Sequence, residues 1–182
     1  MINIPTLITL SRIFVIPVFV FVAAKNPFMG AIIFSLAAIT DFFDGYIARR
    51  SKQVTKLGIL LDPIADKLLV ISALIVLVDM ALVPAWIAIV IIAREFLVTG
   101  LRVVALTKDL VIPAELGGKI KVGAQIASII ILLLDRSLIS YDFFGPLEFL
   151  VEYSVGITLL WAAMIIGLVS GVQYFKAFWK KL

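Results

Sequence analysis

Residues 27–79 read PFMGAIIFSLAAITDFFDGYIARRSKQVTKLGILLDPIADKLLVISALIVLVD, two apolar runs joined by a short charged stretch. Each run is about as long as the roughly 20 mostly apolar residues that a membrane-spanning helix needs. The stretch between them has room only for a turn, so we expect the two runs to lie side by side and antiparallel. Four aspartates, Asp41, Asp44, Asp62 and Asp66, fall where the runs approach that turn.

Apolar runs separated by short polar connections extend over the rest of the chain. Of its 182 residues, 63% are hydrophobic and 15% are charged, and the mean hydropathy is +1.19. Soluble domains are nearer half apolar and a quarter charged. We therefore predict an all-α integral membrane protein with six transmembrane helices, forming a single domain over residues 1–182. The predicted spans are Ile8–Ala24, Pro27–Ile47, Leu57–Val78, Pro84–Leu106, Gly118–Leu134 and Phe149–Phe178.

The positions of Lys and Arg predict the orientation of these spans. If the connections alternate between the two sides of the membrane, one side receives nearly all of the basic residues and the other receives only Lys25 and Arg136. Basic residues are enriched in cytoplasmic loops. We therefore expect a multi-pass protein of the cytoplasmic (inner) membrane with both termini in the cytoplasm.

The chain contains no cysteine and no histidine. These absences exclude disulfides, thiolate nucleophiles, phosphohistidine intermediates and zinc sites built on Cys or His ligands. Any chemistry must therefore come from carboxylates, hydroxyls, Lys, Arg and bound metal ions.

The four aspartates have the spacing of a metal site. Asp41 and Asp44 are three residues apart, and Asp62 and Asp66 are four apart, so a helix places each pair on one face. Four carboxylates held close together repel one another unless cations neutralise them. Oxygen ligands suit Mg²⁺ or Mn²⁺ rather than zinc. Two such ions that share carboxylates recur at sites of displacement at phosphorus, and two ions are predicted here.

A purely structural interpretation of these residues is also open. Asp62 precedes Pro63 and could be the N-cap of a helix that starts there. Arg49 and Arg50 could be interface anchors that pair with the aspartates. Charged side chains inside apolar segments are costly and are usually functional, which favours the metal site.

Written as D-x2-D-G-x2-A-R-x8-G-x3-D-x3-D, the segment from Asp41 to Asp66 resembles the signature of the CDP-alcohol phosphatidyltransferase family at every fixed position. The opening residues 3–12, NIPTLITLSR, are similar to those of a bacterial branch of that family that uses glycerol 3-phosphate, although such sequences usually carry Asn where this chain has Thr6. Residues 93–96, Arg102 and residues 118–121 also resemble that branch.

The resemblance implies a role for each matching residue. Asp41, Asp44 and Asp62 would bind two metal ions, and Asp66 would bind one of them and act as the general base. The residues implied to contact the CDP moiety are Pro5, Thr6, Thr9, Gly45, Arg49 and Thr55. The implied fold has six transmembrane helices around a polar cavity open to the cytoplasm, often as a homodimer.

The implied reaction, a step of phospholipid biosynthesis, moves the phosphatidyl group of CDP-diacylglycerol onto sn-glycerol 3-phosphate and releases CMP. The acceptor phosphate needs cationic partners, and the candidates on the fourth and fifth spans are Arg94, Arg102, Lys119 and Lys121. Alternatively, Arg94 pairs with Glu95 or Asp66, and the two lysines only mark the inner boundary of the membrane. Other acceptors, inositol phosphate or serine, also stay open.

Two other classes of protein fit parts of the pattern. A small cation transporter or channel would use the aspartates as an ion pathway, but such a pathway should carry polar groups at several membrane depths. A structural scaffold would function without Asp62 or Asp66. Nucleic acid is not an expected partner, because no basic stripe with interleaved aromatic residues is present.

Overall fold

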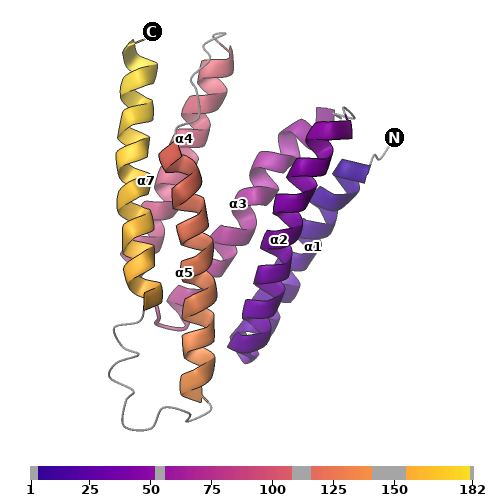
Figure 1. The fold of residues 1–182 in the computed structure, drawn as a ribbon, viewed down its shortest axis with the longest axis vertical. Coiled ribbons are helices and arrows are strands. Elements are labelled where there is room, and N and C mark those ends of the chain that lie inside the picture. The colour runs from indigo at the N-terminus through magenta and orange to yellow at the C-terminus, as the bar shows by residue number, and fades with distance from the viewer. Residues whose placement is uncertain (1–3, 52–55, 108–115, 141–154, 181–182) are drawn as a thin grey trace.

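The computed structural model describes residues 4–51, 56–107, 116–140 and 155–180, and this part of the chain is helical without any strand (Figure 1). Its helices are α1 (Ile4–Lys25), α2 (Pro27–Ser51), α3 (Lys56–Asp79), α4 (Ala85–Thr107), α5 (Leu116–Ser140) and α7 (Val155–Lys180). The all-α prediction is confirmed. Several helices extend beyond the predicted spans, because hydropathy marks only the apolar part of a helix and the backbone hydrogen bonds continue into its polar ends.

Local sequence explains where several helices begin and end. Asn26 accepts a hydrogen bond on its Oδ1 from the Met29 backbone N–H at 3.1 Å, and so caps the start of α2 at Pro27. After α3, Ala81 adopts a left-handed φ of 58°, and the Leu82 N–H bonds back to the Leu77 carbonyl at 2.9 Å. This pattern is a Schellman motif, and it turns the chain into α4.

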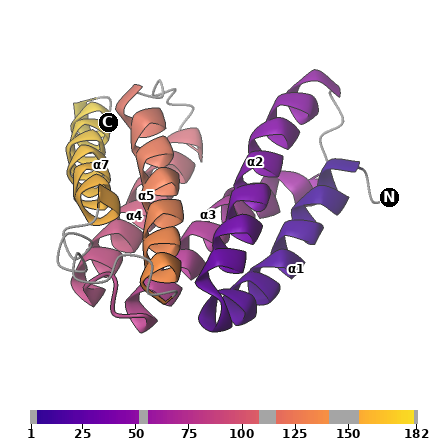
Figure 2. The same ribbon diagram turned by 60° about the horizontal axis from the view of Figure 1, so that its bottom comes forward.

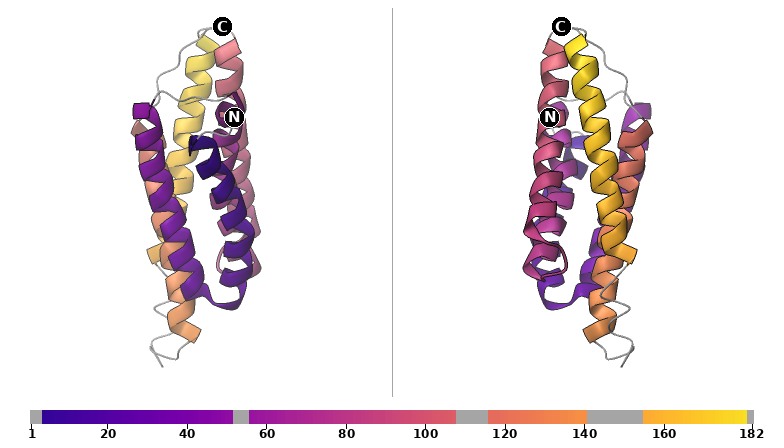
Figure 3. Two further views of the ribbon diagram at one scale, coloured as in Figure 1. Left: turned by 90° about the vertical axis from the view of Figure 1, so that its right-hand side faces the viewer. Right: turned by 90° about the vertical axis from the view of Figure 1, so that its left-hand side faces the viewer.

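The helices form two groups that meet along α2, α3 and α5. Helices α1, α2 and α3 pack together on one side, and α4, α5 and α7 pack together on the other (Figures 1 and 2). Contacts of α5 with α2, and of α3 with α4 and α5, join the two groups. Figure 3 shows that successive helices run antiparallel, so that the first residues of α1, the last of α2 and the last of α7 lie at the same end.

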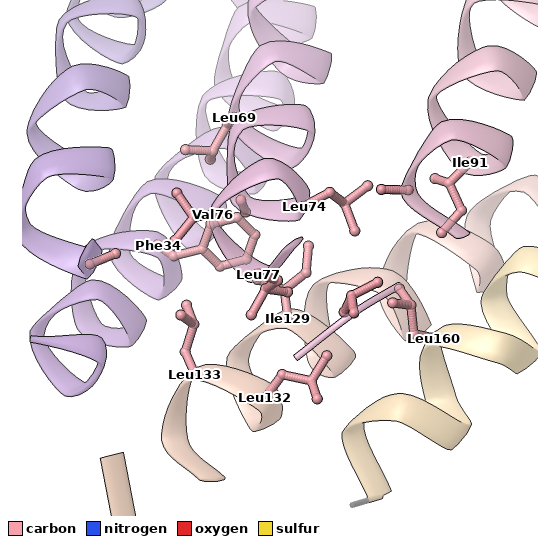
Figure 4. Close-up of a cluster of buried hydrophobic side chains, with 14 of the residues drawn as sticks. Phe34, Leu69, Leu74, Val76, Leu77, Ile91, Ile129, Leu132, Leu133 and Leu160 are labelled. Carbon is pink, nitrogen blue, oxygen red and sulfur yellow. The ribbon is translucent and has the colours of Figure 1, made fainter. Parts of the chain in front are cut away.

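The contiguous apolar core occupies the opposite end of the bundle. It takes side chains from the second half of α1, α3 and α5 and from the first half of α2, α4 and α7 (Figure 4). Its members include Phe19, Phe34, Leu69, Leu74, Val76, Leu77, Ile87, Ile91, Ile129, Leu132, Leu133 and Leu160. The ends of α2 and α3 that carry the aspartates therefore lie beyond this core.

The outer surface of the bundle is strongly apolar. Large hydrophobic side chains such as Phe14, Phe21 and Leu97 are between 63% and 73% exposed, and soluble monomers rarely expose wide apolar surfaces. Within the described residues one helix, Val155–Lys180, is long and apolar enough to cross a membrane, with a hydropathy of 2.2. These features suggest a membrane protein, and the six spans stay a prediction.

A close contact between α1 and α2 gives a test of the packing. A Cβ on Gly30 would lie 2.5 Å from the Ala23 Cβ and 2.8 Å from the Ala23 Cα, which the backbone cannot relieve easily. Gly30→Ala should therefore destabilise the protein by about 1–3 kcal/mol, measured by thermal unfolding in detergent. Gly123→Ala is the matched control, because a Cβ there meets nothing within 4 Å. Equal stability of the two variants would contradict this packing.

Candidate functional site

The aspartate motif lies on the backbone of two helices. Asp41 and Asp44 are in α2, and Asp62 and Asp66 are in α3, which begins at Lys56 and continues through Pro63. Asp62 is therefore inside a helix and not at an N-cap. On a helical backbone, the i, i+3 and i, i+4 spacings put the two positions of each pair on one face. The side chains of these aspartates, of Gly45 and of Arg49 lie outside the described residues, so their assignment as metal and CDP ligands stays a prediction.

The predicted nucleotide contacts on α1 lie at the same end of the molecule as the motif. Pro5, Thr6 and Thr9 belong to the first turns of α1, and α1 packs along both α2 and α3 (Figure 1). The side chains of these three residues, and Thr55 as a whole, lie outside the described part of the chain. The backbone thus places together the helix ends on which the predicted metal and CDP ligands lie.

A second polar group is buried where α4, α5 and α7 meet. Its centre is Glu95 on α4, whose Oε1 accepts hydrogen bonds from two cations: Arg94 Nη1 at 3.0 Å and the Lys121 ammonium on α5. Lys121 is only 3% exposed. A buried ammonium is stable only when a counter-charge lies next to it, and Glu95 supplies that charge.

Arg94 ties α4 to α7. Its Nε donates to the Gly167 carbonyl at 2.9 Å, and its Nη2 reaches the Ser170 hydroxyl at 3.5 Å. A Cβ on Gly167 would lie 3.0 Å from the Lys121 Cδ, so the glycine leaves room for both cations. The ion pair of Arg94 with Glu95, one of the two alternatives that the sequence left open, is therefore present.

The four predicted acceptor-binding cations do not form one cluster in the described structure. Arg94 and Lys121 come together through Glu95, whereas Arg102 lies further along α4, exposed, with its guanidinium carbon 6.0 Å from the centre of the Tyr174 ring. The side chain of Lys119 lies outside the described residues. The assignment of all four to the acceptor phosphate stays a prediction.

The sequence did not predict the central position of Glu95, nor a role for Ser170. Glu95 was named there only as one possible partner of Arg94. The sequence feature that points to Glu95 is an acidic residue next to an arginine inside an apolar helix, which indicates a buried ion pair. This feature does not indicate which other helix supplies the second cation. Lys121 is 26 residues away in sequence, and only the packing of both α4 and α5 against α7 brings it to the same oxygen.

Comparison with known proteins gives matches over nearly the whole chain. Residues 2–172 match the family model described as CDP-alcohol phosphatidyltransferase. A protein of Bacillus subtilis (strain 168) named CDP-diacylglycerol--glycerol-3-phosphate 3-phosphatidyltransferase is 43% identical, over 100% of this chain and 98% of its own length. Proteins with the same name from Rickettsia bellii and Shigella flexneri serotype 5b are 38% and 40% identical, each over 96% of this chain and 94% of its own length.

The buried ion group leads to a stability prediction. Glu95→Leu leaves Lys121 buried without a counter-charge and should cost about 3–5 kcal/mol. The double variant Glu95→Leu/Lys121→Met removes both charges and should recover most of that loss. Unfolding in detergent measures both variants, with Asp79→Ala, an exposed acid at the end of α3, as a control expected within about 0.5 kcal/mol of the parent protein. A double variant less stable than Glu95→Leu alone would contradict the pairing.

Proposed function

This chain belongs to the CDP-alcohol phosphatidyltransferase family and is a phosphatidyltransferase, and from that premise we propose that it transfers the phosphatidyl group of CDP-diacylglycerol to sn-glycerol 3-phosphate. The products are phosphatidylglycerophosphate and CMP. The observation that carries the proposal is the complete aspartate signature at helical spacing on α2 and α3. The names of full-length relatives at 38–43% identity support this acceptor over inositol phosphate or serine.

The residues of the motif fit a pair of divalent cations. Asp41, Asp44, Asp62 and Asp66 offer only oxygen donors, and the helical backbone of α2 and α3 keeps each pair on one face. We propose that these four aspartates hold two Mg²⁺ or Mn²⁺ ions. Bound there, the ions would neutralise the diphosphate of CDP-diacylglycerol and the charge that develops on departing CMP.

The chain's own groups then carry out a direct displacement. The acceptor oxygen forms a bond to the phosphorus of the phosphatidyl group as the bond from that phosphorus to the oxygen of CMP breaks. Asp66 accepts the proton of the attacking hydroxyl. Arg49 and Gly45, with Thr55 and residues Pro5, Thr6 and Thr9 of α1, hold the CDP moiety. No covalent intermediate on the enzyme is needed.

The acceptor carries a dianionic phosphate, and cations on α4 and α5 provide its binding site. Arg102 is exposed, and Lys119 and Lys121 lie on the first turns of α5. Of the cations with described side chains, Arg94 already has all three of its guanidinium nitrogens within reach of protein oxygens. Lys121 is likewise paired with Glu95. We therefore assign the main phosphate contacts to Arg102 and Lys119, and supporting contacts to Lys121 and Arg94.

We further propose that the six helices span the cytoplasmic membrane, with both termini inside, around a polar cavity open to the cytoplasm. The shared end of the termini and of the α2–α3 motif (Figure 3), together with the apolar outer surface, supports this arrangement. The acyl chains of the lipid substrate then stay in the bilayer while its headgroup reaches the aspartates. A homodimer, which the family resemblance implies, is part of the proposal.

An ion pathway through the bundle fits the packing poorly. In the described residues, the halves of the helices away from the aspartates are filled by side chains such as Phe34, Leu77 and Leu133, each 0% exposed. The buried hydroxyls of this layer, those of Ser128 and Ser137, donate to backbone carbonyls, so an ion that crossed it would find few free polar ligands, at a high cost in solvation free energy. The transporter alternative is therefore not favoured.

The carboxylate assignment predicts specific losses of activity. Asp66→Asn should lower kcat by about 10²–10⁴-fold, because the general base is lost, and Asp62→Asn should also inactivate and shift the dependence on Mg²⁺ or Mn²⁺. The assay is CMP release from CDP-diacylglycerol and glycerol 3-phosphate in mixed micelles. Asp79→Asn, at the far end of α3, is the control with parental activity. Parental rates in Asp62→Asn would overturn the proposal.

The cation assignment predicts an effect on acceptor affinity. Arg102→Gln should raise the KM for glycerol 3-phosphate by about 10-fold or more, because a charged hydrogen bond contributes roughly 1.5–3 kcal/mol, and should leave the KM for CDP-diacylglycerol unchanged. Lys176→Gln, an exposed cation on α7, controls for general surface charge. An equal change of both KM values in Arg102→Gln would place this residue outside the acceptor site.

A further inference from the structure

We propose that Gln125 is a specificity-determining residue, whose side-chain amide donates a hydrogen bond to an oxygen of the acceptor alcohol. The inference rests on the proposed function and adds to it a contact that neither the aspartate motif nor the cations supply. Its basis is an unpartnered polar group inside the cavity between α4, α5 and α7.

Gln125 lies one helical turn after Lys121, on the same face of α5. Side chains four residues apart on a helix are neighbours, about 5–6 Å apart at Cβ. Both line one small cavity together with Arg94 and Glu95 of α4 and Gly167 of α7. Gln125 is 3% exposed, and its Nε2 has no hydrogen-bond partner within the described structure.

The neighbouring donors with described partners are already committed to the protein. Each of the three Arg94 nitrogens reaches a protein oxygen, and Lys121 donates to Glu95. One helical turn further on, Ser128 donates to the Gly156 carbonyl at 2.7 Å. Gln125 is thus a buried amide donor without a partner beside a group of charges, and buried amides without partners are rare because each costs free energy.

The chemistry of the cavity wall favours the acceptor as the missing partner. Arg94, Lys121 and Glu95 leave one net positive charge there, which suits a small oxygen-rich anion. The predicted CDP contacts that lie on described helices belong to α1 and α2, whereas this wall comes from α4, α5 and α7. The cavity has room for about one water-sized group as it stands, so a single oxygen of the acceptor would enter it.

An unpartnered amide also has a signature in stability. Replacing it by an apolar side chain of similar shape removes a buried group that lacks a hydrogen bond, which stabilises the fold. A glutamine that served only to join helices would behave in the opposite way, and its loss would destabilise. If Gln125 contacts the acceptor, its replacement by an apolar side chain should therefore raise stability and lower the affinity for the acceptor.

The test is Gln125→Met, which keeps the length of the side chain and removes the amide. We expect an unfolding midpoint in detergent that rises by about 2–4 °C, a KM for glycerol 3-phosphate that rises about 10-fold, and an unchanged KM for CDP-diacylglycerol. Gln125→Glu, which keeps the shape and loses the donor, should raise the same KM further through repulsion of the phosphate. Ser128→Ala is the matched control and should lose stability with an unchanged KM.

Three results would overturn the inference. The first is an unchanged KM for glycerol 3-phosphate in both Gln125 variants, as expected if only a water fills the cavity. The second is a Gln125→Met variant that is less stable than the parent and has an unchanged KM for glycerol 3-phosphate. The third is an equal change in the KM values for glycerol 3-phosphate and CDP-diacylglycerol. Failure of the parent protein to make phosphatidylglycerophosphate would instead refute the proposed function. In that event, protection of the parent but not of Gln125→Met from thermal unfolding by glycerol 3-phosphate would still support the contact.

Discussion

A charge buried among apolar helices must be neutralised by an opposite charge next to it, and this constraint makes the two ends of the bundle different. At the end of the bundle that holds the apolar core, the described helices meet mainly through aliphatic and aromatic side chains such as Phe34, Leu77 and Leu133. Toward the other end, the buried ammonium of Lys121 on α5 is neutralised by the Glu95 carboxylate on α4. Arg94 pairs with the same carboxylate. Glu95 thus makes it possible to bury cations on the helices that are proposed to bind an anionic substrate.

The division suits an enzyme that works on a lipid and a water-soluble anion. A mainly apolar, tightly packed end closes the bundle on one side, and the pair of Glu95 and Lys121 lies toward the other end, where the aspartate motif of α2 and α3 also lies. A phosphoryl-transfer site needs a polar pocket reachable from water and a surface compatible with acyl chains. The apolar outer surface of α1, α4 and α7 provides the second.

Much of this architecture could be read from the sequence, because apolar runs and helical spacing are local properties. The helices fall on the predicted stretches, and α3 begins before Pro63, as the length of a span requires. The predicted spans are shorter than α2 and α5, because hydropathy does not register polar residues that remain helical. The pairing of Arg94 stays open in the sequence because Glu95 is its neighbour in the chain and Asp66 lies on an adjacent span. Only the packing of α4 and α5 against α7 shows Glu95 between two cations.

The sequence by itself determined the helical class and the family, and it predicted the four aspartates as metal ligands, since residue type and spacing along one chain carry all three. Only the tertiary structure decided that Glu95 binds both Arg94 and Lys121, that Gly167 leaves room for them, and that the amide of Gln125 is left without a partner in the same cavity. These relations join residues on three helices far apart in sequence. They depend on helix rotation and distance, which burial of the apolar core sets for the bundle as a whole and which no single segment encodes.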